Sequence, residues 1–145
     1  MSLYSPGNSV TVHKTITFTG AAGFGAPGTA VALFTVTGEV LVVALVPFCT
    51  TNLLEAAPTA TVALGVTGST ALFIAATNSV EIDANEFWVD TTPDANGIAL
   101  PAALKDIVIT DNVVLTPATQ NTNAGVIRFD LVYIPLSTDG SVVAA

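Results

Sequence analysis

The sequence predicts an all-β domain, an antiparallel β-sandwich of jelly-roll-like form, with an immunoglobulin-like sandwich as the alternative. Several segments alternate apolar and polar residues with the period of two that is typical of a half-buried strand. Valine and threonine, which favour strands, are common in these segments. Glycine, proline and asparagine interrupt the chain every dozen residues or so, which indicates roughly eight to ten short strands and at most one short helix.

The first strand is expected over Val10–Thr19, where the alternation is strong. One face carries Val10, Val12, Ile16 and Phe18, and the other carries His13 and four threonines. A glycine-rich loop follows. Its GxG spacing does not continue as the GxGxxG motif of a dinucleotide site, so no such site is expected.

The next two strands are expected over Ala30–Thr37 and Val40–Val46, with Thr37–Gly38–Glu39 as the turn of a hairpin between them. The second run is continuously apolar, but its seven residues are far fewer than the roughly 20 that a membrane-spanning helix needs. A continuous apolar strand is typical of one covered on both faces, in a sandwich core or at a subunit contact. No contact with a membrane is therefore expected.

A second hairpin is expected from Thr59–Val66 and Thr70–Ala76, joined by Thr67–Gly68–Ser69. In the strand over Gly125–Ile134, the side chains of Arg128 and Asp130 share a face and could pair. A helix of a turn or two is expected over Leu100–Lys105. The remaining strands are expected over Val80–Asp83, Glu86–Val89, Asp106–Thr110 and Val113–Leu115.

The composition indicates a protein that assembles with other chains. Of the 145 residues 51% are hydrophobic, whereas only 10% are charged, well below the roughly 25% of a typical soluble domain. Apolar patches left on the surface usually mark contacts with other chains. The net charge of −8 and the three scattered basic residues, Lys14, Lys105 and Arg128, argue against binding to nucleic acid.

No catalytic, cofactor-binding or metal-binding residue is assigned, and the chain is not expected to be an enzyme. His13 is the only histidine and Cys49 the only cysteine, so most hydrolase constellations and any cysteine-based zinc site cannot be assembled. Cys49 lies in an apolar segment, where a buried small hydrophobic side chain is the expected role.

The segment Glu81–Asp90 carries the one acidic cluster of the sequence. Calcium binds several oxygen ligands from such loops, but the spacing does not follow the EF-hand pattern. An exposed Trp88 could stack on a sugar, which leaves a carbohydrate-binding module as an alternative. A solvated loop and a Trp88 packed in the core are the readings that the pattern favours.

The predicted organisation is an N-terminal arm over residues 1–9, a sandwich domain over 10–136 and a C-terminal tail over 137–145. Arms of this kind often order against a partner. The candidate contacts with sister subunits or a shell are Leu3, Tyr4 and Pro6 in the arm and Phe24 in the glycine-rich loop.

Three stretches carry a resemblance to a known class of proteins: IDANEFWVDTTP (Ile82–Pro93), LPAALKDIVIT (Leu100–Thr110) and YIPLSTDGS (Tyr133–Ser141). In an Ala/Thr/Val-rich all-β chain, they resemble small virion structural proteins of tailed bacteriophages. The resemblance runs from about Val10 to the end and is closest to capsid decoration, or cement, proteins.

The resemblance implies a non-enzymatic protein without a cofactor, made in the host cytoplasm and placed on the capsid exterior. It implies a homotrimer whose partners are the sister subunits and the major capsid protein. A decoration protein that binds only the assembled shell would stabilise that shell by mass action. A tail, fibre or baseplate component is the closest alternative within the virion.

Overall fold

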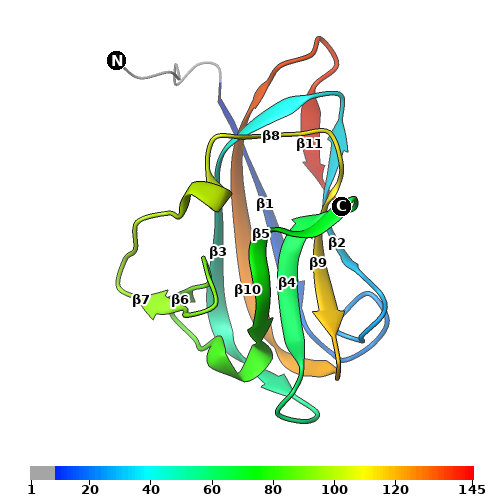
Figure 1. The fold of residues 1–145 in the computed structure, drawn as a ribbon, viewed down its shortest axis with the longest axis vertical. Helices are drawn as coiled ribbons and strands as arrows, with labels where there is room; N and C mark the ends of the chain where they lie inside the picture. The colour runs from blue at the N-terminus through cyan, green and yellow to red at the C-terminus, as the bar shows by residue number, and fades with distance from the viewer. Residues whose placement is uncertain (1–8) are drawn as a thin grey trace.

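The computed structural model describes residues 9–145, which fold into two antiparallel β-sheets packed face to face (Figure 1). One sheet has the strand order β1-β10-β3-β6-β7, with β8 also paired to β3, and the other has the order β11-β2-β9-β4-β5. The predicted all-β antiparallel sandwich is therefore confirmed. The strands are β1 (Val10–Thr17), β2 (Val31–Thr37), β3 (Val40–Glu55), β4 (Thr61–Val66), β5 (Ser69–Asn78), β6 (Glu86–Phe87), β7 (Asp94–Ala95), β8 (Ile107–Ile109), β9 (Val113–Ala118), β10 (Thr122–Pro135) and β11 (Ser141–Ala144).

The core lies between the two sheets and follows the alternation of the sequence. On β10, Ile127, Phe129 and Leu131 are fully buried, whereas Arg128, between them, is exposed. Leu64 of β4 and Leu115 of β9 are the fully buried residues of a register pair in the other sheet. Burial of one such side chain contributes about 1.5–3 kcal/mol, so the inner faces supply the main driving force for folding.

Strand β3 continues for 16 residues, through Pro47, which was expected to end it. Trp88 N donates a hydrogen bond to Pro47 O at 3.1 Å. The N and O atoms of one strand residue point to the same neighbouring strand. The nitrogen of Pro47, which carries no hydrogen, therefore faces β6, a strand of only two residues. The lack of this donor costs no hydrogen bond to β10.

The hairpin predicted at Thr37–Gly38–Glu39 is wrong, because β2 and β3 lie in different sheets. β2 pairs with β9 and β11, whereas β3 pairs with β10. Gly38 has a φ of 65°, and Glu39 O accepts hydrogen bonds from the backbone of residues 136 and 137. The turn is a corner between the sheets. The second predicted hairpin is confirmed: β4 and β5 pair from Thr61 to Asn78.

The C-terminal tail predicted over residues 137–145 is also corrected. It contains β11, which pairs with β2 along its whole length. Val142 is 1% exposed and belongs to the core, which explains why the segment docks. Lys14 Nζ of β1 donates to Ala145 O, so the chain end closes the gap between the edges of the two sheets. The sandwich therefore extends beyond residue 136.

Two short segments take a different form from the one expected. The strand expected over Val80–Asp83 is a 3₁₀ turn, η1 (Ser79–Glu81), held by a buried hydrogen bond of 2.7 Å between Ser79 Oγ and Thr122 Oγ1. The short helix expected over residues 100–105 is a single 3₁₀ turn, η2 (Ala102–Leu104), whose Leu104 is fully buried. None of the helices in residues 9–145 is both long and apolar enough to cross a bilayer.

Candidate interaction surface

The outer face of the six-stranded sheet is unusually apolar for a surface that the described residues leave uncovered. In a two-layer sandwich the outward positions of the strands are normally polar. Here Val108 is 54% exposed, and the other members are partly exposed. We call this set the apolar face; its members are Leu41, Val46 and Phe48 on β3, Val132 and Ile134 on β10, Phe87 on β6 and Val108 on β8.

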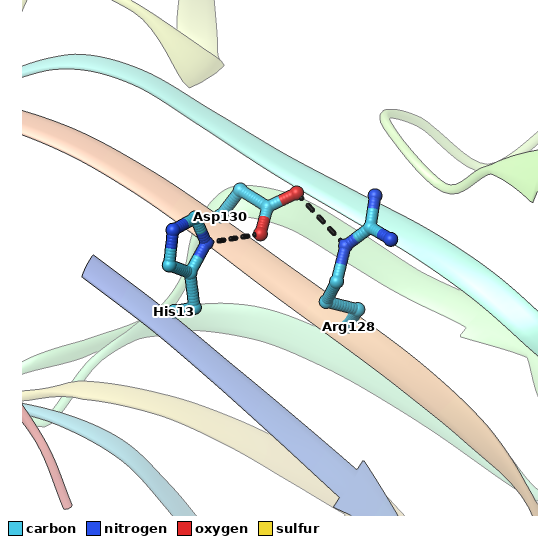
Figure 2. Close-up of polar contacts among 3 residues, drawn as sticks. All are labelled: His13, Arg128 and Asp130. Carbon is cyan, nitrogen blue, oxygen red and sulfur yellow. Dashed lines mark hydrogen bonds and ion pairs between the residues drawn. The ribbon is translucent and has the colours of Figure 1, made fainter. Parts of the chain in front are cut away.

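A polar cluster of three side chains lies beside the apolar face, on the edge strand β1 and on its neighbour β10 (Figure 2). His13 of β1 and Asp130 of β10 are register partners, and His13 Nδ1 lies 2.6 Å from Asp130 Oδ1. Arg128 Nε donates to Asp130 Oδ2 at 3.0 Å, so the pairing expected from the sequence is confirmed. One carboxylate thus holds both basic groups.

The Arg128 side chain lies over an aromatic ring. Its guanidinium carbon is 5.2 Å from the centre of the Phe48 ring, within the range of a cation–π interaction. The Phe48 and Phe87 rings are 4.9 Å apart at an angle of 55°. Within the described part of the chain, Arg128 makes its hydrogen bond through Nε, and its two terminal nitrogens have no partner.

The opposite edge of the same sheet is acidic. The segment from Glu81 to Asp94 contains five of the eleven carboxylates of the chain and no Lys, Arg or His. Figure 1 shows this segment, with β6 and β7, on the side of β3 that faces away from β10. Among residues 9–145, no three His, Cys, Asp or Glu side chains converge as a metal-binding group.

Trp88 is fully buried, and its Nε1 donates to Thr77 Oγ1 at 3.0 Å. The prediction of a core role is confirmed, and Trp88 cannot stack on a sugar in this structure. The alternative of a carbohydrate-binding module therefore loses the aromatic residue on which it depended.

Cys49 is fully buried on the inner face of β3, where Sγ donates to Thr51 O at 3.1 Å. Burial raises the pKa of the thiol to about 11. His13 points outward from the same sheet, so the thiol and the imidazole lie on opposite faces and cannot form a nucleophile–base pair. The described residues also form no pocket.

The predicted contact residues are only partly placed. Phe24 is 50% exposed, in the loop before β2, and is separate in sequence and pairing from the apolar face. Leu3, Tyr4 and Pro6 lie outside the described residues. The contact of His13 with Asp130 could not be predicted from the sequence, because the two residues are 117 positions apart and their register depends on how β1 pairs with β10.

No protein-family model matches the chain, and no curated protein matches it. One solved structure, described as "Cyanophage Pam1 capsid asymmetric unit", contains a chain that is similar to this one. The two share 19% identity with a TM-score of 0.43, over 92% of this chain and 93% of that chain.

Proposed function

We propose that the protein is a structural component of a phage virion, a decoration or cement protein that binds the outside of the assembled capsid as a homotrimer. The apolar face is the observation that carries the proposal. Seven apolar side chains lie outward on one sheet of a chain with only 10% charged residues. Water-exposed apolar surface of this kind is stabilised by contact with other subunits.

The composition explains how such a protein would act. Once the shell has assembled, a subunit that binds only the assembled form shifts the equilibrium toward that form, without any chemical step. The apolar face supplies burial energy at roughly 25 cal/mol per Å² of apolar surface removed from water. The net charge of −8 disfavours binding to the packaged DNA.

The test compares two valines with the same substitution. Val108 of the apolar face is 54% exposed, and Val143, on the outer face of the other sheet, is 56% exposed. In co-sedimentation with shells of the cognate capsid protein, we expect Val108→Glu to weaken retention about tenfold or more, the equivalent of at least 1.4 kcal/mol. Val143→Glu should be retained like the wild type.

Three results would contradict the proposal. They are a wild-type protein that does not sediment with shells, one that sediments with tails instead, and a loss of retention with Val143→Glu but not with Val108→Glu. Thermal unfolding of both variants shows whether the fold is retained, since each change is at an exposed position.

A further inference from the structure

The loop that leaves strand β7 carries Asn96–Gly97, the one asparagine–glycine pair of the sequence. Both residues are exposed, and both have a positive φ, 68° for Asn96 and 121° for Gly97. Glycine adopts such a backbone freely, and asparagine does so more readily than most residues. A Cβ built on Gly97 meets no heavy atom within 4 Å. The link between the two residues is therefore open to water and free of steric contact.

Hydrogen bonds do not hold this loop in place. In the described part of the chain, residues 97–100 make no backbone hydrogen bond, and the Asn96 side chain makes none either. Ile98 and Leu100 pack against the core and anchor the loop by their side chains. A segment with exposed backbone and few hydrogen bonds changes conformation at a low cost in free energy. Asn96 and Gly97 can therefore rotate while the sandwich stays folded.

The other asparagines in residues 9–145 precede backbone amides that are held. Four of these amides donate to a carbonyl oxygen, over N–O distances of 2.9–3.3 Å, and the other two belong to residues of the paired strands β9 and β10. The six asparagines are Asn52, Asn78, Asn85, Asn112, Asn121 and Asn123. Among the described residues, Asn96 is thus set apart both by the glycine that follows it and by the free amide of that glycine.

A comparable pair elsewhere in the chain is locked. Asp139–Gly140 is the one aspartate–glycine pair of the sequence. Gly140 N donates to Ser137 O at 3.0 Å, and Asp139 Oδ1 accepts a hydrogen bond of 2.7 Å from Ser137 Oγ. A Cβ on Gly140 would lie 2.6 Å from Glu39 O, so this backbone is also closely packed. The two pairs share a small following residue and differ in whether its amide is engaged.

We propose that Asn96 is a site of spontaneous covalent modification, at which its side-chain amide is replaced by a carboxylate. Hydroxide removes the amide proton of Gly97, and the resulting nitrogen attacks Asn96 Cγ. A bond forms between Gly97 N and Asn96 Cγ, the bond from Cγ to Nδ2 breaks, and Nδ2 takes a proton from water and leaves as ammonia. The product is a five-membered cyclic imide, and the hydroxide consumed in the first step is regenerated.

Water then opens the imide at one of its two carbonyl carbons. Addition at Cγ breaks the new bond and gives aspartate at position 96. Addition at the backbone carbonyl carbon of Asn96 breaks the original peptide bond and gives isoaspartate, in which the chain continues through Cγ. Either product adds one negative charge to the net charge of −8. The charge arises two residues from Asp94, the register partner of Phe87 in the apolar face.

The inference goes beyond the proposed function, because the reaction needs only water and hydroxide. The experiment incubates the folded full-length protein at neutral and at mildly alkaline pH and measures aspartate and isoaspartate at each asparagine by peptide mass spectrometry. We expect Asn96 to convert about tenfold faster or more than any other asparagine in residues 9–145, because the other amides must first give up a hydrogen bond. The rate should rise with pH, since hydroxide starts the reaction.

Two variants and one internal control sharpen the test. Asn96→Gln lengthens the side chain, so the five-membered ring cannot form, and most of the mass gain of the intact protein should disappear. Gly97→Ala places a methyl group beside the attacking nitrogen and should slow conversion about tenfold. Unfolding in urea should accelerate isoaspartate formation at Asp139 far more than at Asn96, because only the Gly140 amide is released by unfolding.

Three results would overturn the inference. They are an Asn96 that stays unchanged while other asparagines of the folded protein convert, an equal mass gain in Asn96→Gln and the wild type, and an acceleration by urea at Asn96 as large as that at Asp139. Asn96→Gln leaves Gly97 in place, so it remains informative if Gly97→Ala alters the loop. Thermal unfolding of both variants shows whether the sandwich is retained.

Discussion

The two sheets of this sandwich have similar inner faces and different outer faces. Both bury Val, Leu, Ile and Phe side chains toward the shared core. Outward, the five-stranded sheet exposes mainly small residues such as Ala32, Thr35 and Ala75, with Val143 as an exposed larger one, whereas the six-stranded sheet carries the apolar face and the Arg128 cluster. The inner faces are enough to explain the fold, because they provide its hydrophobic burial. The outer faces differ in how well they suit contacts with other chains.

The largest expected effects test whether the two inner faces are equivalent. Phe129 of β10 and Leu115 of β9 are both fully buried, one in each sheet. We expect Phe129→Ala to lower the free energy of unfolding by about 3–5 kcal/mol and Leu115→Ala by about 2–5 kcal/mol, because each leaves a cavity. Urea denaturation measures both. A loss below about 1 kcal/mol for either would mean that its sheet does not share the core.

A smaller effect concerns the inner face of β3 at alkaline pH. Burial raises the pKa of the Cys49 thiol from 9.0 to about 11, so the unfolded chain loses its thiol proton at a lower pH than the folded one. The folded chain therefore keeps its full free energy of unfolding below pH 9 and loses part of it as the pH rises toward 11. The wild type should lose on the order of 3 kcal/mol of unfolding free energy across that range through Cys49.

Cys49→Ala is the control for this prediction, because it removes the thiol and keeps the other groups that titrate at alkaline pH. The difference in unfolding free energy between the two proteins should therefore change across the same range. Parallel pH profiles for the wild type and Cys49→Ala would show that the thiol is not buried as the structure describes.

Local patterns in the sequence predicted the strands whose alternation matches their burial. In β10, the buried Ile127, Phe129 and Leu131 and the exposed Arg128 follow the period of two. The β4–β5 hairpin followed from its turn residues in the same way. The apolar run at Val40–Val46 indicated either a core strand or a subunit contact, and β3 has one face in the core and one in the apolar face.

The errors arise where a long-range partner decides the structure. The residues Thr37–Gly38–Glu39 are typical of a tight turn, but only the pairing with β9 and β10 determines that they form a corner between sheets. The tail became β11 because β2 offers it a free edge and the core accepts Val142. The alignment of Arg128, Phe48, Phe87 and Asp94 across the six-stranded sheet depends on three strand registers, none of which a single sequence fixes.

The smallest expected effect is the loss of His13, which separates the fold from the outer surface. The His13 side chain is 63% exposed and that of Asp130 is 23% exposed. Exposed pairs of this kind contribute about 0–1 kcal/mol and weaken as salt rises. We therefore expect His13→Ala to lower the unfolding free energy by less than about 1 kcal/mol, with a smaller loss in 1 M NaCl than in low salt.

Thr11→Ala, an exposed change two residues away on the same face of β1, is the control for backbone propensity. If His13→Ala instead cost several kcal/mol at both salt concentrations, the imidazole would be part of the folding core and the distinction between the two outer faces would fail. A small, salt-dependent loss has the opposite meaning. It shows that the cluster around Asp130 adds little to the stability of the single chain, as an exposed pair on an outer face should.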